Sequence, residues 1–372
     1  MMKNNKTMKR IILMMIAAVA IVASCGNPDD NGPVSGNGTL TIEADKVELI
    51  ADGEDFVEIT VKYDGEVVTD EVDFYDASTN VPSRVKANRF TTKAVGQYSI
   101  YAIYNGVKSN VLKITALEYA VPSLPADPAP ENVSFRKRVL LTQFTSTGCV
   151  YCPMVTGFLR DLAADPEYKD KFVLAASHAD MPDNPNGDDP ASYPEVNGFM
   201  SAFRIKGFPT LIADFADMLG SYSLAALKTL VDEYYGDGSA AVGISVNSEL
   251  HDNVLVMRAS VKAANAGKYR IGAWLLEDGI YGKQTGAPDE SYYVHDHCIR
   301  KPDAESHYMG YDLGMLSKGK SADHVFVMKL DPKWNIDNCS VLLYVTSASG
   351  SDQIASNAIV VPLDKPVAYE YR

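Results

Sequence analysis

In this 372-residue chain, the residues best suited to chemistry by type and spacing are two cysteines separated by two residues, Cys149 and Cys152. A pair of this kind exchanges disulfides when the first thiolate attacks a substrate disulfide and the second thiol resolves the mixed disulfide. Two thiolates can also form half of a metal site, or a bond that only stabilises the fold. The pair therefore has three interpretations: a redox centre, part of a metal site, or a structural disulfide.

The segments around the pair alternate between strand and helix patterns. Apolar runs predict strands at 139–145, 171–178 and 207–215, and amphipathic patterns predict helices at 152–165, 195–204 and 223–235. This alternation is typical of a layered α/β sheet. Cys149 then lies after a strand and before the first turn of a helix, where backbone N–H groups and the helix dipole favour thiolate over thiol.

Residues 138–238 are predicted to form an α/β domain that resembles thioredoxin-like proteins. The resemblance rests on the CxxC pair after a strand and on Gly207-Phe208-Pro209-Thr210 at the start of the third strand. It implies a cis peptide bond between Phe208 and Pro209, facing the cysteines, where the backbone of a substrate chain can pair.

The same resemblance implies a role for each site residue. Cys149 is expected to be the nucleophile and Cys152 the resolving thiol. Phe208 and Pro209 are expected to bind the substrate backbone, and Tyr151, between the cysteines, is expected to contact the substrate. This chemistry implies no cofactor, and it implies protein thiols or disulfides of the cell envelope as partners.

Two positions depart from the thioredoxin pattern. Gln143 stands where thioredoxins place a buried acid that takes the proton of the resolving thiol, and Gly148 replaces the tryptophan that commonly precedes the pair. An amide cannot shuttle a proton as a carboxylate does. Resolution is therefore expected to be slow, or to use another base.

The N-terminus predicts export and lipidation. Residues 1–24 carry four basic residues and then an apolar run, 11–23, which is too short for a membrane-spanning helix of about 20 residues. Val22-Ala23-Ser24-Cys25 resembles the lipobox of bacterial lipoproteins, so Cys25 is the expected lipidation site and 25–38 a lipidated tether. The expected location is the outer membrane, facing the periplasm or the cell surface.

The net charge limits the classes of partner, and the cysteine count bears on which disulfides can form. Removal of the signal leaves 30 basic against 48 acidic residues, which argues against nucleic acid and anionic lipid as partners. Five cysteines are present, and lipidation of Cys25 leaves four in a compartment that permits disulfides. Beside the CxxC pair, Cys298 and Cys339 are candidates for a structural disulfide that closes a long loop.

Composition predicts the remaining domains. Short alternating strands separated by turn dipeptides predict an immunoglobulin-like β-sandwich over 39–118, which resembles bacterial immunoglobulin-like domains. A proline-rich linker is expected over 119–137, and alternating runs predict a second β-sandwich over 239–372. The fold class expected for the chain is thus β-sandwich, α/β thioredoxin-like domain and C-terminal β-sandwich.

The order of these parts resembles an outer-membrane lipoprotein family named after a 28-kilodalton outer membrane protein. The similarity covers the C-terminal two thirds and includes Trp274–Ile280 (WLLEDGI) and His295–Arg300 (HDHCIR). The role of that family is poorly defined, so the resemblance implies architecture more than reaction.

Other motifs offer weaker alternatives. The acidic loop 179–192 has aspartates but no EF-hand spacing, so calcium stays an open alternative to a solvated loop. No metal site is expected at the cysteines or at His295, His297 and Cys298, since strand neighbours alternate in direction. Residues 314–321 match GxxxxGK[ST] without a strand-to-helix context, so no nucleotide is expected. Against thiol–disulfide exchange stands one rival: a surface binding or adhesive protein that uses the α/β fold only as a scaffold.

Overall fold

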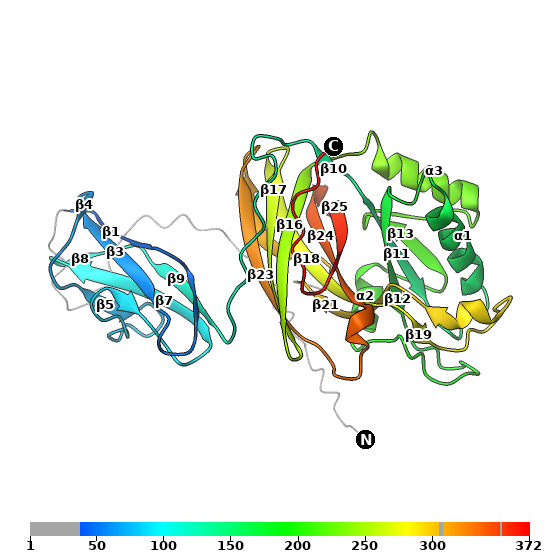
Figure 1. Cartoon of the computed structure of the whole chain (residues 1–372), viewed down its shortest axis with the longest axis horizontal. Coiled ribbons are helices and arrows are strands. Elements are labelled where there is room, and N and C mark those ends of the chain that lie inside the picture. Colours follow the sequence, from blue (N-terminus) through cyan, green and yellow to red (C-terminus); the bar gives the residue numbers. More distant parts are fainter. Residues whose placement is uncertain (1–37, 305–307, 350–351) are drawn as a thin grey trace, which may run out of the picture. The chain divides into compact units, whose positions relative to one another are not determined.

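The computed structural model describes residues 38–304, 308–349 and 352–372. By contacts within the chain these residues form two compact units, a smaller one built mainly on residues up to Ile114 and a larger one built mainly on Thr115–Arg372 (Figure 1). None of the described helices is both long enough and apolar enough to cross a membrane.

The N-terminal strands form two small sheets. In one sheet β3 pairs with β1, β4 and β6; the strands are β1 (Leu40–Ala44), β3 (Val57–Tyr63), β4 (Glu66–Val67) and β6 (Arg89–Phe90). The other has the order β2-β9-β7-β5 with β8 beside β7; its strands are β2 (Glu48–Ile50), β5 (Asp73–Asp76), β7 (Gly96–Tyr104), β8 (Val107–Lys108) and β9 (Leu112–Leu117). In β3 every second side chain, Val57, Ile59 and Val61, is buried, as the alternating pattern requires.

A nine-stranded sheet is the backbone of the larger unit. Its order is β14-β13-β11-β12-β21-β18-β24-β25, with β22 also paired to β18. The strands are β11 (Val139–Thr145), β12 (Phe172–His178), β13 (Thr210–Ala213), β14 (Asp217–Met218), β18 (Gly267–Glu277), β21 (Cys298–Asp303), β22 (Tyr311–Leu316), β24 (Cys339–Ser349) and β25 (Asp352–Pro362). β11 runs parallel to β12 and antiparallel to β13.

Helices cover both faces of the sheet at the end that carries β11. α1 (Cys152–Ala164) and α3 (Leu224–Tyr235) lie side by side on one face, where they bury Val139 and Leu141 (Figure 1). α2 (Val196–Ala202) packs on the other face, among Leu140 and Phe144. β11 is buried along its whole length, since its successive side chains point into these two separate cores.

A second, smaller sheet of C-terminal strands packs against the nine-stranded sheet. β16 (Val242–His251), β17 (Val254–Ala263) and β23 (Ser321–Lys329) form a three-stranded antiparallel sheet, whose core side chains pack against those of β18 and β24. The short elements are β10 (Phe135–Arg136), β15 (Ser239–Ala240), β19 (Ile280–Tyr281), β20 (Val294–His295) and the 3₁₀ helices η1 (Glu290–Tyr293) and η2 (Ile336–Asn338).

A buried ion pair ties the end of the linker to the large sheet. Lys137 Nζ lies 2.6 Å from Asp214 Oδ2, and both side chains are less than one tenth exposed. Asp214 Oδ1 also accepts the backbone N–H of Leu140 at 2.7 Å, and the lysine lies within hydrogen-bond range of the carbonyls of Ala355 and Ser356. The pair therefore connects β11, the turn after β13, and β25.

The observed fold agrees with the expectation of a β-rich chain with several sheets, and only three α-helices occur in the described ranges. Each predicted strand and helix around the cysteines is present within a few residues of its expected ends. One sheet passes through both of the segments predicted as 138–238 and 239–372. The domain boundaries themselves stay predictions.

Candidate active site at the Cys149–Cys152 disulfide

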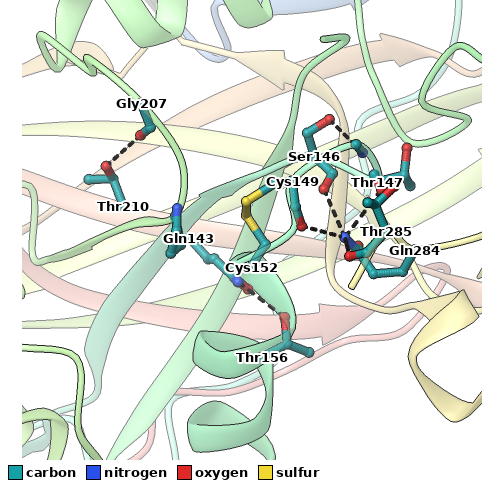
Figure 2. Close-up of a disulfide and its surroundings, with 12 residues drawn as sticks. Gln143, Ser146, Thr147, Cys149, Cys152, Thr156, Gly207, Thr210, Gln284 and Thr285 are labelled. Carbon is teal, nitrogen blue, oxygen red and sulfur yellow. Dashed lines mark hydrogen bonds between the residues drawn. A yellow bond between two sulfur atoms is a disulfide. The ribbon is translucent and has the colours of Figure 1, made fainter. Parts of the chain in front are cut away.

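The two cysteines form a disulfide where β11 passes into α1. Their Cα atoms are 5.5 Å apart, and Cys152 is the first residue of α1, with Pro153 next (Figure 2). Cys149 is 3% exposed and Cys152 1%, whereas Val150 and Tyr151 between them are 50% and 69% exposed. The pairing expected from the spacing is confirmed, but the sulfur atoms are covered and only the intervening side chains face solvent.

The Phe208–Pro209 segment lies beside this turn. The peptide bond between these residues is cis, as the resemblance implied. β13 pairs with β11 so that Thr210 is opposite Phe144, which places Pro209 next to the end of β11. The Tyr222 hydroxyl donates to the Pro209 carbonyl at 2.6 Å. The sheet thus brings the proline segment and the cysteine turn to neighbouring strand ends.

Gln143 lies in β11 below the start of α1 and is almost fully buried. Its Nε2 donates to Thr156 Oγ1 at 3.2 Å (Figure 2). Thr156 is one helical turn after Cys152 and therefore lies on the same face of α1. The amide thus occupies the place expected for the acid, and it is held by a hydroxyl on the helix that carries the resolving thiol.

A segment far away in the sequence, residues 282–286, closes over the cysteine turn, and we refer to it as the strap. Gln284 Nε2 lies 3.2, 3.2 and 2.9 Å from the carbonyl oxygens of Ser146, Thr147 and Cys149 (Figure 2). The backbone N–H of Thr285 donates to the Thr147 carbonyl at 2.8 Å. The strap therefore holds the carbonyl groups of the turn that precedes the helix.

Glycine at position 286 allows the strap to approach this closely. Gly286 has φ +73°, and a Cβ at this position would lie 2.4 Å from the Val150 carbonyl oxygen. A side chain would thus meet backbone, which cannot move aside as a flexible side chain can. The strap can therefore contact the turn only with glycine here.

The loop after β12 holds the same turn from another side. Asp189 Oδ2 accepts the backbone N–H of Thr147 at 2.7 Å and faces His178 Nδ1 at 3.0 Å. Burial alone would raise the pKa of Asp189, but His178 and the N–H donors outweigh it and lower this pKa. Asn184 Nδ2 donates to Thr147 Oγ1 at 2.9 Å. A Cβ on Gly148 would lie 2.9 Å from the Cβ of Asn184, so this loop fills the space that a larger residue before the pair would need.

The same contacts bear on calcium binding by residues 179–192. Asp180 accepts the backbone N–H of Asp189 at 2.7 Å, and Asp189 is paired with His178. Within the described ranges no group of three or more histidine, cysteine or acidic side chains is arranged to hold a metal ion. Asp180 and Asp189 thus hold the loop itself together; Asp189 is buried, while Asp180, Asp183 and Asp188 are exposed.

A cavity of about 100 Å³ lies between α1 and the segment that follows the strap. The polar side chains that line it include Gln143, Thr145, Thr156, His178, Gln284 and His295. The His178 and His295 rings meet edge to face with centroids 4.9 Å apart, and His295 Nε2 is 2.9 Å from the Gly282 carbonyl oxygen. Burial, followed by the nearby His178, lowers the pKa of His295 to about 4.

A comparison of the sequence with known protein families gives a match. Residues 197–362 match the family described as outer membrane protein Omp28. The chain resembles the Omp28 family. The resemblance expected from the sequence is thereby confirmed, and so is the predicted location in the outer membrane. No sequence among the curated proteins matches the chain.

Solved structures are also similar to parts of the chain. HBP35 of Porphyromonas gingivalis has 23% identity and a TM-score of 0.53, over 63% of this chain and 78% of its own. A protein from Agrobacterium tumefaciens has 16% identity and a TM-score of 0.42, over 64% and 99%. A domain of the outer membrane lipoprotein Omp28 from Porphyromonas gingivalis has 13% identity and a TM-score of 0.23, over 34% and 89%. The first of these shows a shared fold.

The expected Cys298–Cys339 disulfide is wrong, because both thiols are free and buried. Glu277 of β18 pairs with Cys298 on one side and with Cys339 on the other. Two strand spacings separate the cysteines by roughly 10 Å, beyond the Cα separation of about 7 Å that a disulfide spans. Burial raises the pKa of Cys298 well above the ordinary thiol value and that of Cys339 to about 12.

Two further sequence predictions concern residues 314–321 and the N-terminus. Residues 314–321 run from the end of β22 through a turn into β23, so they join two strands and not a strand to a helix. The predicted signal, residues 1–24, and Cys25 lie outside the described residues. The strap and the His178–Asp189 pair are site features that the sequence patterns did not reveal.

Proposed function

We propose that the protein is a lipid-anchored outer-membrane thiol–disulfide exchanger whose segment 138–238 is thioredoxin-like. The observation that carries the proposal is the disulfide at the junction of β11 and α1. The parallel β11–β12 pair, the antiparallel β13 preceded by Pro209, and α1 and α3 on one face support it. Fold similarity alone would not, because one fold serves many functions.

In the proposed reaction Cys149 is the nucleophile. With both thiols reduced, its thiolate attacks a protein disulfide, which forms a mixed disulfide and releases one substrate thiolate. Cys152 then loses its proton and attacks the Cys149 sulfur, which releases the second substrate thiolate and restores the disulfide. The substrate gains two electrons and the cysteine pair loses two, so no cofactor is required.

Three exposed or adjacent groups are proposed to receive the substrate. Tyr151 offers an aromatic surface that is 69% exposed beside the buried sulfur atoms. Phe208 and Pro209 lie next to the end of β11, where an extended substrate chain would pair with backbone. The partners proposed on this basis are protein thiols or disulfides of the cell envelope.

A second function, that of a binding scaffold with an inert disulfide, is favoured by one specific observation. Both sulfur atoms are buried, and Gln284 of the strap contacts the carbonyls of the turn. A disulfide that no thiolate can reach acts only as a structural cross-link. The two functions therefore differ in whether the strap opens.

Trapping in cells decides between them. Cys152→Ser keeps the nucleophile and removes the resolving thiol, so an exchanger accumulates mixed disulfides that are visible on non-reducing gels. Cys298→Ser, which removes a buried thiol elsewhere, is the matched control. Exchange is supported if only Cys152→Ser traps partners and if the pair has a moderate reduction potential; a potential below about −300 mV with no trapped partner supports the scaffold.

A further inference from the structure

The proposed exchange leaves one proton unassigned. Cys152 must lose its proton before it attacks the mixed disulfide, because the thiolate is the nucleophile. The side chain that lies nearest along β11, Gln143, is an amide that donates to Thr156 and has no proton-accepting role at neutral pH. The base must therefore lie elsewhere, within reach of the start of α1.

The cavity beside α1 connects this place to a histidine. Gln143 and Thr156, which meet on the Cys152 face of the helix, line it on one side, and His178 lines it on the other. In the β11–β12 register Gln143 is opposite Ala176 and Thr145 opposite His178, so these side chains lie along one face of adjacent strands. This cavity of about 100 Å³ is lined by both polar and apolar side chains, and it has room for several water molecules, each of which needs only about 10–15 Å³ of such space.

His178 is oriented as a proton acceptor by its carboxylate partner. Its Nδ1 lies 3.0 Å from Asp189 Oδ2, and both side chains are almost completely buried. A carboxylate at Nδ1 fixes the tautomer with the proton on that nitrogen, which leaves Nε2 with its lone pair free to accept. The same carboxylate oxygen holds the Thr147 N–H, so one group sets the position of both the base and the cysteine turn.

The other titratable group in contact with His178 is a poorer acceptor. His295 already uses Nε2 on the Gly282 carbonyl, and burial lowers its pKa to about 4, so it holds few protons at neutral pH. The remaining charged or titratable groups around the cavity and the pair are Arg160, Tyr292, Asp296, His297 and Cys298. Imidazole is the side chain that exchanges protons near neutral pH. His178 has a buried carboxylate 3.0 Å behind it, whereas His297 faces Asp278 at 3.4 Å in a pair whose side chains are both about half exposed.

We propose that His178, positioned by Asp189, accepts the proton of Cys152 through water in this cavity during resolution of the mixed disulfide. The inference rests on the proposed exchange function. In the step, the Cys152 S–H bond breaks, the proton passes through water to His178 Nε2, and the thiolate displaces the substrate thiolate from Cys149. The imidazolium is stabilised by Asp189, and it later returns its proton to solvent or to the departing thiolate.

The test measures the resolution step directly. The fully reduced chain is mixed with oxidised glutathione, samples are quenched with acid, and intact mass separates the dithiol, the glutathione adduct and the disulfide. The decay of the adduct gives the resolution rate from pH 5 to pH 10. The variants are His178→Gln, which keeps a donor toward Asp189, and Asp189→Asn; the control is His251→Gln, a change of the same kind in β16.

Wild type and control are expected to resolve with a rate that levels off near neutral pH. His178→Gln is expected to be slower by about 100-fold at pH 7, with a rate that rises tenfold per pH unit and meets the wild type at alkaline pH, where hydroxide removes the proton. Asp189→Asn is expected to lie between them, and it carries the test if His178→Gln does not fold by circular dichroism.

Two other results have separate meanings. If both variants resolve as fast as the wild type, or are slower by one constant factor at every pH, His178 is not the proton acceptor and the inference fails while exchange stands. If reduced wild-type protein forms neither adduct nor disulfide with oxidised glutathione, the proposed exchange function fails, and the inference fails with it.

Discussion

Removal of the Gln284 amide should expose the disulfide to reduction. Gln284 Nε2 reaches three carbonyls of the cysteine turn at 2.9 to 3.2 Å, and its two hydrogens can satisfy two of them at a time. Each hydrogen bond contributes about 0.5–1.5 kcal/mol net, so the amide holds the strap closed by about 1–3 kcal/mol. Because Cys149 is only 3% exposed, a reductant must wait for the strap to open. Gln284→Ala should therefore accelerate reduction by about 5- to 140-fold, at 1.4 kcal/mol per factor of ten.

The assay is the time course of reduction by dithiothreitol under native conditions. Samples are quenched with acid and alkylated, and the fraction of opened disulfide is read from the intact mass. Gln97→Ala, an exposed glutamine in β7, is the matched control and should reduce at the wild-type rate. A Gln284→Ala rate within twofold of the wild type, in a protein that melts at the wild-type temperature, would show that the strap does not limit access to the sulfur atoms.

Three further predictions concern stability and free thiols. Burial lowers the pKa of both His295 and His324 to about 4 in the folded chain, so as pH falls the unfolded chain binds these protons first. The free energy of unfolding is therefore highest above about pH 6.5. It drops toward pH 4 by about 1.4 kcal/mol per pH unit for each of the two histidines. Urea unfolding at pH 7, 6 and 5 should show this slope, and His324→Phe should halve it. Asp214→Ala leaves its buried lysine partner unpaired and should cost about 3–5 kcal/mol in the same assay. Alkylation after denaturation without reductant should modify Cys298 and Cys339; their protection would contradict the free thiols.

Local patterns were sufficient to predict the elements that carry the site. The apolar run at 139–145 and the helical pattern at 152–165 became β11 and α1, because each is buried on faces that its own sequence specifies. The spacing of Cys149 and Cys152 also predicted their bond, since two residues at a helix start bring the sulfur atoms together whatever surrounds them.

Features that depend on tertiary contacts could not be predicted in this way. The strap lies more than 130 residues after the cysteines, and its contact depends on a glycine that carries no pattern of its own. The supposed Cys298–Cys339 disulfide failed for the same reason: the sequence does not reveal that β18 lies between the two strands. Strand order determines such distances, and it emerges only when the sheet is assembled.

Both departures from the thioredoxin pattern have a counterpart in the loops around the disulfide. Gly148 leaves space that Asn184 fills, and the same loop places Asp189 against the Thr147 N–H. Where the thioredoxin pattern has a tryptophan before the cysteine pair, this chain thus has contacts from residues 36 or more positions away. Gln143 removes a proton acceptor from β11, while the neighbouring strand places His178 on the same cavity. Under the proposed exchange, Asp189 links the proposed base to the cysteine turn, because the same carboxylate contacts His178 and the Thr147 N–H. In an inert scaffold the same contacts would only hold the loop and the turn in place, so the pH profile of resolution in Asp189→Asn separates the two functions.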